Sequence, residues 1–265
     1  MEKSYYGLIT ALGLGPKEHV AVVGGGGKST LCFALAEALG QTGARVISTT
    51  TTKVWQAEAN AFPRLVLYAS DGPGLEAIKK GLDEVGNVFL GQEFLENGKV
   101  DGIPSTLADD LFRTPGVEYV IIEADGAAGR PLKAPAAHEP VIPESVTTVI
   151  ALMGLKALGK PLGADTVFRP ALFKALTGLK EGDILNPEGL ARAFDGRMGL
   201  FKNTPVSARR MVFLNQLDVL PDDRAARDLA RHLLSAQPFI ERVILGSFWK
   251  NAFIRILRRE FENEN

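Results

Sequence analysis

The residues best suited to chemistry in this 265-residue chain form one short segment, a run of glycines followed by Lys-Ser-Thr. Residues 20–23 before it are apolar and predict a buried strand, and residues 31–39 after it predict a helix. Backbone N–H groups of such a loop approach an anion closely, and the N-terminus of the helix favours negative charge. We therefore predict that this segment binds phosphate, with contacts from Gly24, Gly25, Gly26, Gly27, Lys28, Ser29 and Thr30.

Each polar residue of the segment has an expected role. The Lys28 ammonium and the amides of residues 25–28 would hold the β- and γ-phosphates of ATP or GTP, and the Ser29 hydroxyl would ligate Mg2+. The spacing is not the standard Gly-x4-Gly-Lys-Ser/Thr, because Val22 stands where the first glycine belongs. A glycine-rich turn with a surface lysine is the structural alternative. The order of strand, glycines, lysine and helix favours nucleotide binding.

Hydroxyl groups follow the next expected strand, residues 43–48, in a run of four threonines. The end of a strand near a phosphate loop is a frequent place for ligands of the γ-phosphate and of Mg2+. We expect Thr50 and Thr51 to sense the γ-phosphate. The alternative is an ordinary edge strand, because threonine favours β-structure.

Two carboxylates follow residues 119–122, which are apolar on both faces as in a central parallel strand. Such carboxylates match the Walker B arrangement, in which an acid holds Mg2+ or orients an attacking water. We predict Asp125 as a metal ligand and Glu123 as the group that orients water. An ordinary strand exit is the alternative, because Asp-Gly is common in turns.

A proline-rich loop, residues 127–143, follows directly and contains two cations, an imidazole and a carboxylate. Its prolines exclude a long helix, and loops of this kind often carry function. Lys133 is predicted to bind the cofactor, and His138 is a candidate catalytic residue. A lone histidine is more often structural or solvated, which is the alternative for His138.

A further strand, residues 210–215, ends in Asn215-x-x-Asp218. This ending is similar to the Asn-Lys-x-Asp motif of GTP-binding proteins, whose aspartate accepts two hydrogen bonds from guanine. Gln216 replaces the lysine here. We predict that Asn215 and Asp218 contact the base, although polar residues end many strands.

Taken together, these motifs resemble the YqeC family, accessory proteins of selenium-dependent molybdenum hydroxylases. The resemblance implies a nucleotide-binding, cytoplasmic protein that helps a molybdenum enzyme to mature. Its implied partners are the client hydroxylase or the proteins that mature its cofactor. The matching segments are 23–29, 48–53, 123–126, 130–135, 138–143 and 214–218.

The elements that must position these residues alternate between strands and helices. We predict an α/β fold, a mostly parallel P-loop-like sheet flanked by helices. The whole chain, residues 1–265, is expected to be one nucleotide-binding domain, with a helical insertion or lid at residues 155–207. Residues 248–261 are expected to form a C-terminal helix with Phe253, Ile256, Leu257 and Phe261 on its packing face.

Composition narrows the function classes further. A net charge of −1 argues against nucleic acid as a partner, and no apolar run is long enough for a membrane span. The single cysteine, Cys32, cannot form an internal disulfide, which favours a cytoplasmic location.

Three functions fit these observations. The first is a Mg2+-dependent NTPase that couples ATP or GTP to cofactor or selenium delivery. The second is a ligase or transferase, because the loop resembles the phosphate loop of peptidoglycan amino-acid ligases. The third is a nucleotide-gated chaperone that does not hydrolyse nucleotide.

Overall fold

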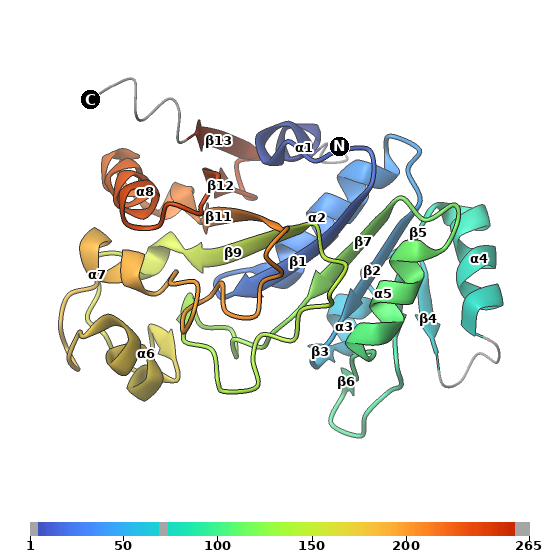
Figure 1. Cartoon of the computed structure of the whole chain (residues 1–265), viewed down its shortest axis with the longest axis horizontal. Coiled ribbons are helices and arrows are strands. Elements are labelled where there is room, and N and C mark those ends of the chain that lie inside the picture. The colour runs from blue at the N-terminus through green and yellow to red at the C-terminus, as the bar shows by residue number, and fades with distance from the viewer. Residues whose placement is uncertain (1–4, 69–73, 258–265) are drawn as a thin grey trace. The chain divides into compact units, whose positions relative to one another are not determined.

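The computed structural model describes residues 5–68 and 74–257 and divides into two compact units (Figure 1). Unit 1 comprises Met1–Val22, Ser29–Gly126 and Val141–Thr148. Unit 2 comprises Val23–Lys28, Ala127–Pro140 and Val149–Asn265. The expectation of a single domain over 1–265, with an insertion at 155–207, stays a prediction.

Unit 1 is built on parallel strands in the order β1-β7-β2-β5-β4. Val22 of β1 and Thr50 of β2 both align with Glu123 of β7 between them, so β2 and β7 end at the same level and β1 continues two residues farther. The last two residues of β1 belong to unit 2. The strands are β1 (Glu18–Gly24), β2 (Val46–Thr50), β4 (Leu65–Leu67), β5 (Asn87–Gly91) and β7 (Tyr119–Glu123).

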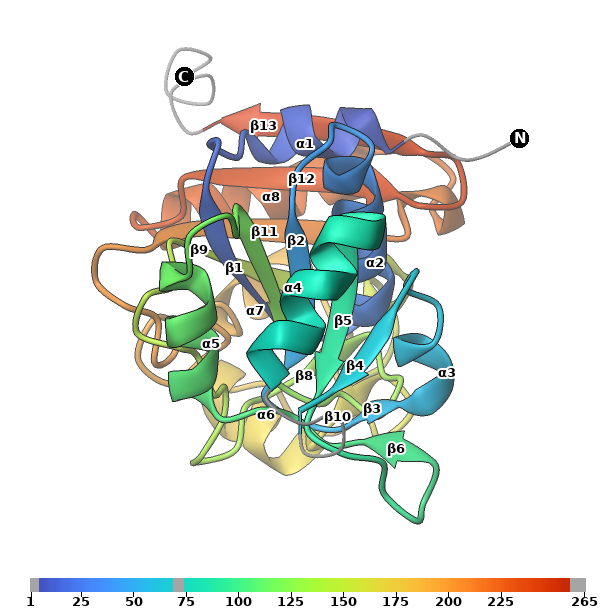
Figure 2. The same cartoon turned by 90° about the vertical axis from the view of Figure 1, so that its right-hand side faces the viewer.

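Helices and one small antiparallel pair complete unit 1. Helix α4 packs against β4 and β5, and α5 packs against β7 (Figure 2). Strands β3 and β6 pair antiparallel. These elements are α1 (Tyr6–Leu12), α2 (Lys28–Gly40), α3 (Gln56–Ala59), α4 (Gly74–Val85), α5 (Ser105–Arg113), β3 (Val54–Trp55) and β6 (Lys99–Val100).

Unit 2 contains strands in the order β9-β11-β12-β13. Strands β11 and β12 are parallel, with Leu214 opposite Leu245, whereas β13 runs antiparallel to β12. The strands are β9 (Thr148–Gly154), whose first residue lies in unit 1, β11 (Arg209–Asn215), β12 (Arg242–Ser247) and β13 (Ala252–Leu257).

The C-terminal helix predicted for residues 248–261 is wrong over its described part. Residues 252–257 form β13 instead, and the rest of the predicted packing face, Phe261, lies outside the described residues. The physical reason is tertiary: the open edge of β12 offers backbone partners, and Phe253 packs against Phe213 and Phe248. Such long-range pairing overrides a helical spacing of apolar residues.

Short helices form most of the remainder of unit 2, as the sequence predicts for residues after 154. Helix α7 packs between α6 and α8, and α8 packs on β12 (Figure 1). A two-stranded parallel pair, β8 with β10, was not expected. These elements are η1 (Leu155–Ala157), α6 (Pro170–Thr177), α7 (Pro187–Arg192), η2 (Leu217–Val219), α8 (Arg224–Ala236), β8 (Leu132–Lys133) and β10 (Val167–Phe168).

The predicted fold class is confirmed: a mostly parallel mixed sheet is flanked by helices. Every residue of β1, β2 and β9 is buried, as expected for strands that are covered on both faces. Their Val- and Ile-rich sequences suit that environment. No helix in the described ranges is both long and apolar enough to cross a membrane.

Candidate functional site

The glycine loop leads from β1 into α2, as the sequence predicts. Three of its residues adopt left-handed backbone conformations, with φ of 100° at Gly24, 86° at Gly26 and 118° at Gly27. Residues with a Cβ rarely adopt such values, whereas glycine does so without steric cost. The loop therefore depends on glycine for its shape, not only for its flexibility.

The loop is also packed tightly against the backbone of unit 2. The Gly25 amide donates to Leu152 O at 2.9 Å, and the Gly26 amide donates to Arg130 O at 3.0 Å. A Cβ on Gly26 would overlap the backbone nitrogen of Gly154. Two of the four amides predicted to hold phosphates thus donate to protein carbonyls in this structure.

Lys28 is buried, with 5% of its surface exposed, and its ammonium group folds back over the loop. The Nζ atom donates to Gly24 O at 3.0 Å. A cation is therefore held at the N-terminus of α2, where the helix dipole also attracts an anion.

The end of β11 is fastened to the glycine loop within unit 2. The Asn215 amide nitrogen donates to Gly26 O at 2.8 Å, and its Oδ1 accepts from the Gln216 amide at 2.8 Å. Asp218 lies farther along, in η2, and accepts a hydrogen bond from the Ser247 hydroxyl. The sequence pointed to Asn215 and Asp218, but it gave no signal for Ser247, which is distant in the chain.

In unit 1, the first turn of α2 meets the end of β7. The Ser29 hydroxyl donates to Glu123 Oε2 at 2.9 Å. The Thr50 hydroxyl donates to the Glu123 carbonyl at 2.8 Å, and Thr51 donates its hydroxyl to Val141 O at 2.8 Å. The structure thus brings Ser29, Thr50 and Glu123 together, whereas Thr51 forms its hydrogen bond with the end of the proline-rich loop.

The hydroxyl and carboxylate oxygens of Ser29, Glu123 and Asp125 are of the kind that ligates magnesium. Mg2+ prefers carboxylate, hydroxyl and water oxygens and is usually held by one or two protein ligands together with phosphate oxygens. Ser29 and Glu123 already share a hydrogen bond, and Asp125, two residues beyond the end of β7, is buried with 1% exposure. Thr30 is exposed on α2.

The proline-rich loop of unit 2 is held by a buried ionic cluster. Lys133 Nζ donates to Glu139 Oε2 at 2.8 Å, and Arg169 donates to both oxygens of the same carboxylate. Burial alone would raise the pKa of Glu139, but the hydrogen bonds from Arg169 and Lys133 lower it to about 2. The carboxylate is therefore ionised at neutral pH and locks the loop to the residue before α6.

Other side chains complete this loop. Lys202 Nζ donates to Ala137 O at 2.6 Å, and Asn203 donates to Pro140 O at 2.9 Å. His138 lies exposed on the surface of the loop. The catalytic role of His138 and the cofactor contact of Lys133 stay predictions.

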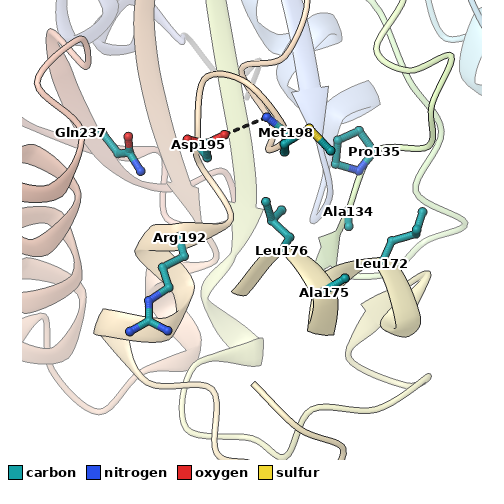
Figure 3. A pocket seen from close by; sticks show the side chains of 9 residues that line it. All are labelled: Ala134, Pro135, Leu172, Ala175, Leu176, Arg192, Asp195, Met198 and Gln237. Atoms are coloured by element: carbon teal, nitrogen blue, oxygen red, sulfur yellow. Dashed lines mark hydrogen bonds between the residues drawn. The ribbon is translucent and has the colours of Figure 1, made fainter. Parts of the chain in front are cut away.

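A cavity of about 490 Å3 lies elsewhere in unit 2 (Figure 3). Apolar side chains from α6 form much of its wall, and Arg192 of α7 and Asp195 add charge. No residue of the glycine loop lines it. The lining residues are Ala134, Pro135, Leu172, Ala175, Leu176, Arg192, Asp195, Met198 and Gln237.

Two comparisons with solved structures give a TM-score of 0.42. Chloroplast FtsY from Physcomitrella patens is 12% identical, and the match covers 98% of this chain and 71% of that chain. Cell division protein FtsY from Thermotoga maritima is 17% identical, with coverage of 93% and 67%.

The family model described as YqeC protein matches residues 20–171. The uncharacterized protein YqeC of Escherichia coli (strain K12) is 34% identical over 235 residues, which is 89% of each chain. The family-model match includes the glycine loop, the end of β7 and the proline-rich loop. Both matches confirm the resemblance: the chain belongs to the YqeC family.

Proposed function

We propose that this protein binds a nucleoside triphosphate with Mg2+ and hydrolyses it. The observation that carries the proposal is the glycine loop, in which three glycines have positive φ and the buried Lys28 ammonium lies over Gly24 O. An anion that enters this loop meets a cation and a helix N-terminus. A triphosphate carries the charge and the length that such a loop recognises.

The remaining residues have defined roles in this proposal. Lys28 would exchange its bond to Gly24 O for phosphate oxygens, and Ser29 with Asp125 would hold Mg2+. The ion would neutralise charge on the phosphates. Glu123 would orient the attacking water through its carboxylate, and the Thr50 hydroxyl, which bonds the Glu123 carbonyl at 2.8 Å, would hold the end of β7 in place.

We also propose that nucleotide binding assists maturation of a selenium-dependent molybdenum hydroxylase. The support is membership of the YqeC family and the resemblance stated for its motifs. The client hydroxylase, or a protein that matures its cofactor, would be the partner.

The first test is calorimetric titration of non-hydrolysable ATP and GTP analogues with Mg2+. Lys28→Ala should weaken binding by roughly 10- to 100-fold, because a hydrogen bond to a charged group contributes about 1.5–3 kcal/mol. Lys180→Ala removes an exposed lysine of unit 2 and should leave binding unchanged. Equal affinity of wild type and Lys28→Ala would exclude the loop as the phosphate site.

Hydrolysis needs a separate measurement. Release of inorganic phosphate should be lost in Glu123→Gln, while binding of the analogue is kept. Turnover that begins only after a second substrate is added would instead indicate a transferase. Nucleotide-dependent capture of a molybdenum hydroxylase without phosphate release would indicate a chaperone.

A further inference from the structure

The carboxyl edge of unit 2 places a polar turn next to the glycine loop. Asn215 uses its amide nitrogen on Gly26 O at 2.8 Å and its amide oxygen on the Gln216 amide, so both of its polar atoms fix the turn. The Gln216 side chain packs against Gly154, since a Cβ on Gly154 would overlap Gln216 Oε1. The amide oxygens of both residues are therefore directed into the protein, and Asp218 is the acidic residue of this turn.

Asp218 is oriented by the neighbouring strand. Ser247 ends β12, which runs parallel to β11 with Leu214 opposite Leu245, so the two strand ends lie at the same edge. The Ser247 hydroxyl is 1% exposed and donates to Asp218 Oδ1. The same hydroxyl accepts from the Lys250 amide at 3.1 Å, which fixes its proton toward the aspartate.

The bond from Ser247 uses one acceptor position of the Asp218 carboxylate. Asp218 is half-buried. Within the described part of the chain, its carboxylate accepts one side-chain hydrogen bond, from the Ser247 hydroxyl. An ionised carboxylate has about four acceptor positions and no donor. A carboxylate held in one rotamer therefore recognises a ligand edge that presents two adjacent N–H groups.

Guanine presents such an edge, through its N1–H and its 2-amino group. Adenine presents an unprotonated ring nitrogen at the corresponding position, so a carboxylate there would face another acceptor. Two acceptors that face each other form no hydrogen bond, so the site would bind adenine much more weakly than guanine. We propose that Asp218, oriented by Ser247, makes the nucleotide site selective for guanine. The inference rests on the proposed function, because it assumes that the triphosphate lies in the glycine loop.

The test compares GTP, ATP and XTP analogues by calorimetry in the presence of Mg2+. Wild type should bind the GTP analogue more tightly than the ATP analogue by roughly 10- to 100-fold, since a charged hydrogen bond contributes about that factor. Asp218→Asn should weaken GTP binding by a similar factor. It should also strengthen XTP binding, because the new amide donates to the 2-oxo group of xanthine.

Two further variants separate recognition from folding. Ser247→Ala should weaken GTP binding several-fold while leaving binding of inorganic triphosphate unchanged. Asp228→Asn changes an exposed aspartate of α8 and should not alter any of these affinities. Thermal midpoints of all variants show whether each is folded.

The outcomes distinguish this inference from the proposed function. If wild type binds neither nucleotide, both fail. If wild type binds ATP as tightly as GTP and Lys28→Ala weakens the binding of both, the proposed function stands and the guanine assignment is overturned. Loss of GTP binding in Asp218→Asn without a gain of XTP binding would also overturn it, because a purely structural aspartate predicts that result.

Discussion

His19, at the start of β1, lies in the interior of unit 1 with no exposed surface. The Nδ1 atom of His19 is 2.9 Å from the Ser145 hydroxyl oxygen. The centroids of the His19 and Phe112 rings are 5.0 Å apart. Ser145 in turn donates to the Asp109 carboxylate at 2.6 Å. Burial lowers the pKa of His19 to about 4, although the Asp109 charge acts in the opposite direction. The imidazole is therefore neutral at pH 7.

This pKa makes stability depend on pH. The unfolded chain, with a histidine pKa near 6.5, binds a proton that the folded chain excludes until pH 4, so stability falls on acidification through that window. Between pH 7 and pH 5 the free energy of unfolding should fall by about 2 kcal/mol. Urea denaturation at both pH values measures this change.

Substitution identifies the group responsible. His19→Gln should remove most of the loss between pH 7 and pH 5, because glutamine does not titrate. His138→Gln changes an exposed histidine and should leave the loss intact. An unchanged pH profile in His19→Gln would assign the effect to other groups.

At the scale of elements, the glycine loop combines two separate constraints. One is the positive φ of its residues, and the other is close contact with the backbone of residues 152–154. Gly26 is subject to both, with φ of 86° and the Gly154 nitrogen beside it. Gly43 has nearly the same φ, 85°, but nothing lies within 4 Å of a Cβ placed there.

This pair of glycines allows the two constraints to be separated. Gly43→Ala should cost about 1 kcal/mol of stability, the strain of a left-handed alanine. Gly26→Ala should cost at least about 2 kcal/mol more, because overlap with backbone forces a shift in a packed region. Urea denaturation of the two variants gives the difference, and equal losses would show that the loop can move away from Gly154.

For the whole molecule, ligand binding and folding are linked. The loop at residues 23–28 takes its shape from contacts with other segments of unit 2, including Arg130 O and Leu152 O. An unfolded chain lacks that shape and should not bind the nucleotide. A ligand that binds only the folded state stabilises that state by mass action.

A GTP analogue with Mg2+ at 100 times its Kd should therefore raise the free energy of unfolding by about 2.7 kcal/mol. The measurement is urea denaturation with and without the ligand. The increase should shrink to about 0.4–1.4 kcal/mol in Lys28→Ala at the same ligand concentration, because binding there is 10- to 100-fold weaker, and it should persist in full in Lys180→Ala. Stabilisation of the Lys28→Ala protein to the same extent would place the ligand at another site.

Much of the fold follows from local sequence. Apolar β-branched runs gave the strands at 20–23, 119–122 and 210–215, and the Ala- and Leu-rich segment after the glycines gave α2. The C-terminal segment shows where this reasoning fails. Residues 252–257 have an apolar spacing that suits a helix, yet they pair with β12, because the partner strand supplies hydrogen bonds that no local pattern reveals.

The candidate site divides in the same way. The sequence by itself determined the glycine loop, Lys28, the carboxylates at the end of β7 and the Asn-x-x-Asp turn, because their chemistry lies within a few consecutive residues. Only the tertiary structure decided which groups meet: Ser29 with Glu123, Arg169 with Glu139, and Ser247 with Asp218. These partners are 29 to 94 residues apart, and strand order and register, which depend on packing of the whole chain, bring them together.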